Sequence, residues 1–217
     1  MTLMTDYIDK TIAAYDQSPD KYFESTREMI PPHEFSRFVK SVKGLSNRVL
    51  DAGCAFGRDS SAFHDAGFEV TGIDLSAGLL QKARELNPEL DFKKMDVRSL
   101  DFANDAFGGI WCHAVLLHLN DEDIVKALKE FYRVLKPGGT LFVSFKKGEG
   151  TQEVLEAFSS EASRFYNSKT IEPLRSILQE IGFGDIDAYY INEQELFGPD
   201  KRDLDWLHCF STKGAES

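Results

Sequence analysis

From residue 48 onward, short runs of apolar and β-branched residues alternate with longer stretches that have apolar side chains on one helical face. This alternation is typical of βαβ units, in which helices join parallel strands. The pattern predicts strands at residues 48–52, 69–74, 91–95, 109–113 and 140–145. It predicts helices between them at residues 59–66, 77–86 and 122–135. Because short crossovers are right-handed, we expect one largely parallel sheet with helices on both faces.

The remaining segments extend this core at both ends. Residues 170–181 have a helical pattern that Gly182 ends, and strand-like runs follow at 187–191 and 206–212. The sequence therefore predicts an α/β, Rossmann-like doubly wound fold, with seven strands that are mostly parallel and an antiparallel last strand. We expect one domain over residues 1–217. Its expected parts are an N-terminal helical lid at 1–46, a cofactor-binding core at 47–147, a lid or insertion at 148–169, and a C-terminal helix and strands at 170–217.

Charge and cysteine content narrow the classes of partner. The chain has 36 acidic and 25 basic residues, and its net charge of -11 disfavours a nucleic-acid partner. Three cysteines without metal-ligand spacing predict neither disulfides nor a metal site. No apolar run approaches the roughly 18 residues that span a bilayer, and the N-terminus lacks a signal-peptide pattern. We expect a cytoplasmic protein with no membrane partner, and the sequence leaves its oligomeric state open.

A turn with small residues follows the first predicted strand. The strand ends in Asp51 and leads through Gly53, Cys54, Ala55 and Gly57 into a helix. Small residues there let the backbone turn sharply and approach a ligand. The second strand ends in Asp74, at the edge where a carboxylate can accept hydrogen bonds from both ribose hydroxyls of an adenosine. The pattern predicts a site for an adenosine-containing ligand.

Details of the turn distinguish two such ligands. The spacing departs from the Gly-x-Gly-x-x-Gly pattern of dinucleotide sites, because position 55 is alanine. A carboxylate at Asp51 would repel a pyrophosphate and would suit a cationic amino-acid group. The turn therefore favours S-adenosylmethionine over NAD. Arg58, at the start of the helix, fits either a hydrogen bond to a carboxylate or a surface position.

Five segments together resemble the class I S-adenosylmethionine-dependent methyltransferase family, and in particular its small type 11 members. They are Val49-Leu50-Asp51-Ala52-Gly53-Cys54-Ala55-Phe56-Gly57-Arg58-Asp59, Gly72-Ile73-Asp74-Leu75-Ser76, Met95-Asp96-Val97, His118-Leu119 and Arg133-Val134-Leu135-Lys136-Pro137-Gly138-Gly139. The resemblance implies that the turn from Asp51 to Gly57 contacts the methionine portion and that Asp74 binds the ribose. It further implies that Asp96 and Val97 bind the adenine, whose face Leu75 covers.

Two positions depart from the family pattern. Ala55 stands where the family usually has a glycine, which adds one methyl group near the sulfonium. Gly108 stands where the family usually has the aspartate of a Phe-Asp-Gly sequence. Because that aspartate usually supports the fold, we still expect the chain to bind the cofactor.

Histidines after the fourth predicted strand are candidates for the catalytic site. The resemblance implies that residues 114–119 lie beside the transferred methyl group. His118 is a candidate general base or substrate contact, because imidazole titrates near neutral pH, and simple packing is the alternative. His113 is either structural or a cofactor contact. Transfer from a sulfonium needs no covalent enzyme intermediate, so we interpret Cys54 and Cys112 as core residues.

The methyl acceptor is expected between the N-terminal helices and the segment after the fifth strand. Tyr15 and Tyr22 are candidates to close over the adenosine, with core packing as the alternative. Lys147, Arg164 and Tyr166 are candidates to hold a small anionic or zwitterionic acceptor. We predict a methyltransferase that acts on oxygen or nitrogen of a small molecule. The alternatives are a tRNA or protein methyltransferase, an inactive cofactor-binding regulator and an NAD-dependent oxidoreductase.

Overall fold

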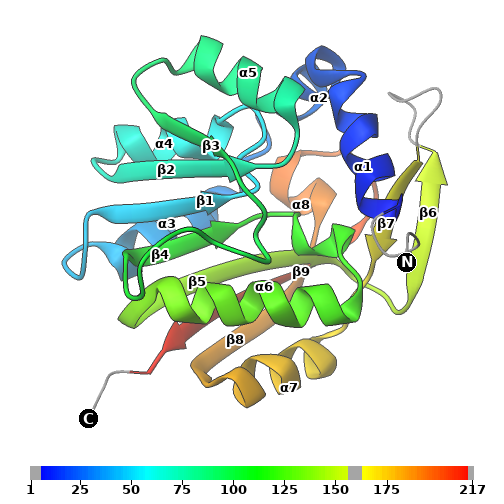
Figure 1. Ribbon diagram of the computed structural model, residues 1–217. Coiled ribbons are helices and arrows are strands. Elements are labelled where there is room, and N and C mark those ends of the chain that lie inside the picture. Colours follow the sequence, from blue (N-terminus) through cyan, green and yellow to red (C-terminus); the bar gives the residue numbers. More distant parts are fainter. Residues whose placement is uncertain (1–5, 156–162, 215–217) are drawn as a thin grey trace.

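The computed structural model describes residues 6–155 and 163–214, and its centre is a seven-stranded sheet (Figure 1). The strands lie in the order β3-β2-β1-β4-β5-β9-β8. Their bounds are β1 Arg48–Ala52, β2 Glu69–Asp74, β3 Asp91–Lys94, β4 Phe107–Cys112, β5 Leu135–Lys146, β8 Phe183–Asn192 and β9 Asp205–Lys213. The first five pair in parallel, and β9 runs antiparallel to both β5 and β8. The predicted fold class is confirmed.

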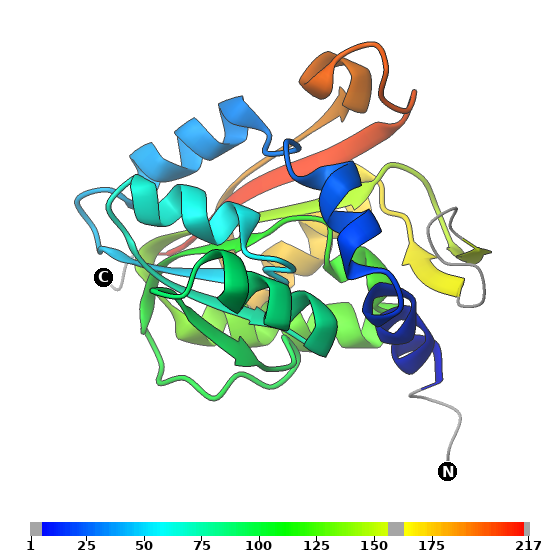
Figure 2. The same cartoon turned by 90° about the horizontal axis from the view of Figure 1, so that it is seen from above.

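Helices cover both faces of this sheet (Figures 1 and 2). On one face, α3 and α4 pack an aromatic core in which Trp111 stacks on Phe142 with ring centroids 4.1 Å apart. On the other face, α6 and α7 cover a larger core that is mostly aliphatic and includes Phe107, Phe131 and Phe145. The helices are α1 Asp6–Asp16, α2 Pro19–Thr26, α3 Pro32–Val42, α4 Arg58–Asp65, α5 Ala77–Leu86, α6 Asp121–Val134, α7 Ile171–Ile181 and α8 Glu193–Phe197, with a short 3-10 turn, η1, at Leu116–His118. None of the described helices has the length and apolar character to cross a membrane.

The start of β5 differs from the sequence-based prediction. The strand begins at Leu135, five residues before the predicted start, because Leu135 pairs with Phe107 across a bulge. Close packing against Ser46 explains the glycine at position 108, where the family usually has an aspartate. A Cβ atom at Gly108 would lie 2.5 Å from the Cβ of Ser46, so a larger side chain does not fit there.

A hairpin outside the main sheet occupies part of the segment predicted as a lid or insertion. It consists of β6 (Thr151–Leu155) and β7 (Ser163–Asn167), and residues 156–162 of the same segment lie outside the described residues. Helix α1 packs on β7, where the amide of Phe165 donates to the hydroxyl of Thr11 at 3.0 Å. Helix α1, from the start of the chain, and β7, from its C-terminal half, therefore lie side by side at the carboxyl edge of the parallel strands (Figure 1).

Candidate active site

The turn after β1 has a backbone that few residues can adopt. Gly53, Ala55 and Gly57 have φ angles of 83°, 48° and 82°, all in the left-handed region. A Cβ atom at Gly53 would lie 2.1 Å from Cγ2 of Val115, so only glycine fits without movement of that side chain. The amide of Ala55 donates to Oδ2 of Asp74 at 2.9 Å. The turn is thereby fixed against the end of β2.

Asp74 is held by backbone donors at the edge of the sheet. Its Oδ2 atom accepts from Ala55, and its Oδ1 atom accepts from the amide of Ser76 at 2.8 Å. Burial raises the pKa of Asp74, although these backbone hydrogen bonds oppose the shift. Two acceptor positions of the carboxylate remain for a ligand, because a carboxylate offers about four lone pairs.

Asp74 lines a cavity of about 110 Å³, which we call the small cavity. Seven of the residues predicted to bind the cofactor share this cavity. They are Gly53, Ala55, Asp74, Leu75, Asp96, Val97 and His113. Met95 adds a further apolar side chain, and Arg98 holds the Asp96 carboxylate through hydrogen bonds of 2.6 to 3.0 Å.

Three other residues predicted to bind the cofactor do not line either of the two cavities described here. Asp51 is buried and accepts a hydrogen bond from the hydroxyl of Ser60, and burial together with the Asp59 charge raises its pKa. Cys54 packs in a small apolar cluster with Phe92. Gly57 is the N-cap of α4, and a Cβ atom there would lie 2.8 Å from Phe92. These three residues support the shape of the turn.

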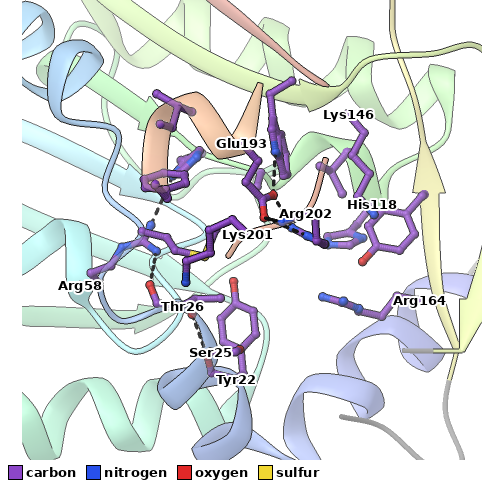
Figure 3. Close-up of a pocket in the computed structure, with 18 of the residues that line it drawn as sticks. Tyr22, Ser25, Thr26, Arg58, His118, Lys146, Arg164, Glu193, Lys201 and Arg202 are labelled. Carbon is purple, nitrogen blue, oxygen red and sulfur yellow. Dashed lines mark hydrogen bonds and ion pairs between the residues drawn. The ribbon is translucent and has the colours of Figure 1, made fainter. Parts of the chain in front are cut away.

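A second cavity, of about 330 Å³, adjoins the first, and we call it the large cavity (Figure 3). Arg58 and Arg164 lie on opposite sides of it. Its charged lining consists of five cations and two acids, which are Arg58, Lys146, Arg164, Lys201, Arg202, Glu193 and Asp200. The two cavities share the lining residues Tyr15, Tyr22, His113, Ala114 and His118. A group in one cavity would thus lie next to a group in the other.

Arg58 is fixed in this wall by several partners. It forms an ion pair with Asp59, donates to the carbonyl of Thr26 at 2.9 Å and lies 3.3 Å from Nδ1 of His113. Burial alone would raise the pKa of Asp59, but the Arg58 charge holds this pKa well below its usual range. The indole of Trp111 also donates to Asp59. Arg58 therefore contributes a fixed positive charge, balanced by Asp59 behind it.

Both ring nitrogens of His118 are engaged. Nε2 lies 2.9 Å from the hydroxyl of Tyr15, and Nδ1 lies 2.7 Å from the carbonyl oxygen of Phe165. Burial, with the nearby Arg164 charge, lowers the pKa of His118 to about 3. The imidazole is then neutral near pH 7, so Nδ1–H donates to Phe165 and Nε2 accepts from Tyr15. In this arrangement His118 connects α1 to β7.

Four of the residues predicted to contact the acceptor besides His118 line the large cavity, and one does not. Tyr15, Tyr22, Arg164 and Tyr166 belong to its lining. Lys147 instead pairs with Asp205 on the surface, with its Nζ atom 2.8 Å from a carboxylate oxygen. Its neighbour Lys146 lines the cavity, and its Nζ atom lies 3.4 Å from the ring centroid of Tyr166.

Sequence reasoning missed the C-terminal wall of the large cavity. Helix α8 and the start of β9 form this wall, where Glu193 is buried and accepts from Arg202 at 2.7 Å and from the indole of Trp206 at 3.0 Å. The sequence pattern predicted no helix between the strand-like runs at 187–191 and 206–212. Asn192 followed by Glu195 matches a helix start, and Asn192 does cap α8 by accepting from the amide of Gln194.

The chain is thus an α/β protein with a mostly parallel sheet and two adjoining cavities that share five lining residues. A family model for a methyltransferase domain matches residues 49–139. A demethylmenaquinone methyltransferase of Renibacterium salmoninarum is 32% identical over 141 residues, which cover 63% of this chain and 58% of that protein. A malonyl-[acyl-carrier protein] O-methyltransferase of Enterobacter lignolyticus is 30% identical over 137 residues, which cover 61% and 54%.

The chain thus spans between 54 and 58% of the length of these two relatives. Among solved structures, the 1,6-didemethyltoxoflavin-N1-methyltransferase of Burkholderia thailandensis superposes with a TM-score of 0.75. It is 20% identical, and the match covers 99% of this chain and 92% of that one, so the likeness concerns the fold. Residues 49–139 thus match a methyltransferase domain, which supports the resemblance to class I S-adenosylmethionine-dependent methyltransferases.

Proposed function

We propose that the protein transfers a methyl group from S-adenosylmethionine to oxygen or nitrogen of a small molecule. The observation that carries this proposal is the common wall of the two cavities, formed by Tyr15, Tyr22, His113, Ala114 and His118. One cavity contains a carboxylate suited to a ribose, and the other is a separate chamber. Methyl transfer requires two ligands whose reacting atoms lie about 3 to 3.5 Å apart, and two adjoining chambers support the proposal that both ligands bind here.

The residues that line the small cavity are chemically suited to the adenosine part of S-adenosylmethionine. Asp74 has free acceptor positions for ribose hydroxyls, and the apolar side chains of Leu75, Met95 and Val97 suit the faces of a flat ring. Because Gly53 has no side chain, the backbone of the turn itself lines the small cavity at this position. When bound, this cofactor supplies a methyl group on a positively charged sulfur.

The chain's own residues position the acceptor and exclude water. Tyr15 and Tyr22 come from the N-terminal helices, and burial raises the pKa of both phenols, so both stay neutral hydroxyls near pH 7. Tyr15 is held between Arg164, which donates to its oxygen at 2.7 Å, and His118. This network fixes the wall between the chambers, and fixed geometry is the main source of rate acceleration in a direct displacement.

The charges of the large cavity support an anionic acceptor. Five cations line it against two acids, although the whole chain has a net charge of -11. Guanidinium and ammonium groups in a partly enclosed site bind carboxylate or phosphate strongly. A volume of about 330 Å³ is within the usual range for small-molecule sites. A macromolecular acceptor such as tRNA has less support, because the acidic protein would repel its backbone.

Calorimetry with S-adenosylmethionine and S-adenosylhomocysteine tests the cofactor, and release of S-adenosylhomocysteine with small hydroxy and amino carboxylates tests the acceptor class. We expect binding in the micromolar range and turnover that depends on the carboxylate of the acceptor. An absence of binding at high micromolar cofactor concentration contradicts the proposal. Equal turnover of acceptors with and without the carboxylate contradicts the anionic class alone.

A further inference from the structure

A buried acid–histidine pair lies at the C-terminal side of the large cavity. His208 belongs to β9 and Glu34 belongs to α3, and both side chains are fully buried. Nδ1 of His208 lies 3.0 Å from Oε1 of Glu34. The same oxygen accepts a hydrogen bond from the hydroxyl of Tyr189 at 2.8 Å. No motif in the sequence connects these residues, because 174 positions separate the acid from the histidine.

The second ring nitrogen of His208 faces a different environment. Nε2 is buried and has no hydrogen-bond partner among the described residues, and His208 is part of the lining of the large cavity. A buried polar atom without a partner is uncommon, and a ligand in the cavity would supply one. Because the carboxylate orients the ring through Nδ1–H, the lone pair of Nε2 is left available as a proton acceptor.

The groups around His208 keep this arrangement. Burial would raise the pKa of Glu34, but hydrogen bonds from His208 and Tyr189 lower this pKa to about 2. Glu34 therefore stays a carboxylate. Burial raises the pKa of Tyr189, which remains a hydroxyl donor. His113, after β4, has its ring centroid 6.2 Å from that of His208, and Phe142 from β5 packs at 5.4 Å. His113 also belongs to the wall that separates the two cavities.

His118, the histidine favoured by the sequence, is arranged differently. Its two nitrogens already bond to Tyr15 and Phe165, so a proton from an acceptor would require one of these bonds to break. Nε2 of His208 has no hydrogen bond within the described residues that would have to break. The geometry of an oriented imidazole with one open nitrogen is the one that a general base requires.

We propose that His208 is the general base for the methyl acceptor and that Glu34 is its positioning residue. This inference rests on the proposed function. The acceptor is then a hydroxyl or amine that loses a proton: the new carbon–oxygen or carbon–nitrogen bond forms while the carbon–sulfur bond breaks, and the electron pair of the broken bond stays on sulfur. The acceptor's proton moves to Nε2 of His208 and leaves later to solvent.

Two variants and one control separate this role from a structural one. His208→Asn removes the base, Glu34→Gln keeps the shape of the carboxylate, and His33→Asn changes an exposed histidine of the same helix α3. We expect all three to bind S-adenosylhomocysteine with wild-type affinity by calorimetry. With the hydroxy and amino carboxylate panel, we expect His208→Asn to lower kcat by about 100-fold or more with little change in KM. We expect Glu34→Gln to lower kcat less, and His33→Asn to leave it unchanged.

A measurement without any acceptor tests the same point. Nitrogen NMR of histidine-labelled protein with S-adenosylhomocysteine reports which ring nitrogen of His208 carries the proton, and the His208→Asn spectrum assigns the signal. We expect a protonated Nδ1 and an unprotonated Nε2 at pH 7.5. A proton on Nε2 at that pH, or unchanged kcat in His208→Asn, overturns the inference. If the wild-type protein binds no S-adenosylhomocysteine, the proposed function fails instead, and the two failures are therefore distinct.

Discussion

At the scale of single residues, the candidate site depends on backbone conformation as much as on side-chain chemistry. Ala55 adopts a left-handed conformation with φ 48°, in the position where the family usually has glycine. Such a conformation costs about 1 to 2 kcal/mol for a residue with a side chain. The hydrogen bond from its amide to Asp74 offsets part of this cost. The strained residue of the turn, Ala55, thus donates a hydrogen bond to Asp74, the residue that we expect to bind the ribose.

Replacement of Asp74 by asparagine should weaken cofactor binding. The ribose would lose charge-assisted hydrogen bonds, each of which contributes about 1.5 to 3 kcal/mol. We expect the Kd for S-adenosylhomocysteine to rise by about 10- to 100-fold in calorimetry. Asp65→Asn, at an exposed position at the end of α4, is the matched control and should bind as the wild type does. Equal affinities for the two variants would refute the role of Asp74.

Replacement of Gly53 by alanine should destabilise the protein. The new methyl group would overlap Val115, and the φ angle of 83° disfavours any side chain. We expect the free energy of unfolding in urea to fall by about 2 kcal/mol or more. Gly184→Ala is the control, because a Cβ atom there has no neighbour within 4 Å, and its effect should stay within about 1 kcal/mol. Similar losses in both variants would contradict this account of the turn.

At the scale of elements, the N-terminal helices complete the site that the sheet begins. Helix α1 joins β7 through Thr11 and joins α5 through Asp16, whose carboxylate accepts from the amide of Gly78 at 2.9 Å. Tyr15 and Tyr22 line both cavities. A cofactor in the small cavity would therefore contact elements that are joined to the core mainly by side-chain contacts.

Cofactor binding should slow hydrogen exchange in α1 and α2. A ligand that contacts Tyr15 and Tyr22 in the bound state raises the free energy of local opening of these helices. Hydrogen-exchange mass spectrometry with and without S-adenosylhomocysteine measures this. Peptides from α7, on the far side of β5, are the internal control and should not change. Equal protection of α7 and α1 would indicate global stabilisation and not closure of the N-terminal helices.

The sequence predicts the elements of the parallel core more closely than those that complete the site. Predicted bounds match the structure for β1, β2 and α5, where apolar periodicity is strong and Ser76 caps α5. Helix α8 was not predicted, because five residues give too little periodicity. The position of Lys147 was also not predictable, since the pairing register of β5 decides which of two adjacent lysines faces the cavity. Contacts between distant segments, such as Glu34 with His208, leave no local signal.

At the scale of the whole molecule, buried ionisable groups couple stability to pH. His118 has a folded-state pKa of about 3 against an ordinary value of 6.5. Below pH 6.5 the unfolded chain therefore takes up a proton that the folded protein does not. By the linkage relation, the His118 contribution to the free energy of unfolding falls as the pH falls through this window. Asp51 contributes in the opposite direction, because its pKa is raised to about 8 in the folded protein.

The His118→Gln variant should lack the His118 contribution to this pH dependence. Between pH 6.5 and pH 5, we expect the contribution of His118 to lower the wild-type free energy of unfolding by about 1.5 kcal/mol. Glu34 contributes little there, because its own pKa values of 4.5 when unfolded and about 2 when folded lie below the window. Urea unfolding at several pH values measures the slope. The exposed His33→Gln variant should keep the wild-type slope, and an unchanged slope in His118→Gln would rule out a buried neutral imidazole.

The contact between α1 and β7 has a consequence for how the protein is made. The first helix leaves the ribosome about 150 residues before its partner strand, and β9, which lies between β5 and β8, follows later still. Contacts of such high sequence separation form late in folding. A nascent chain that ends before Asn167 lacks part of the strand on which α1 packs. All the lining residues of the small cavity are present in such a chain, whereas the large cavity still lacks the wall formed by α8 and β9. Binding of a ligand in the large cavity therefore requires that synthesis has reached the C-terminal strands.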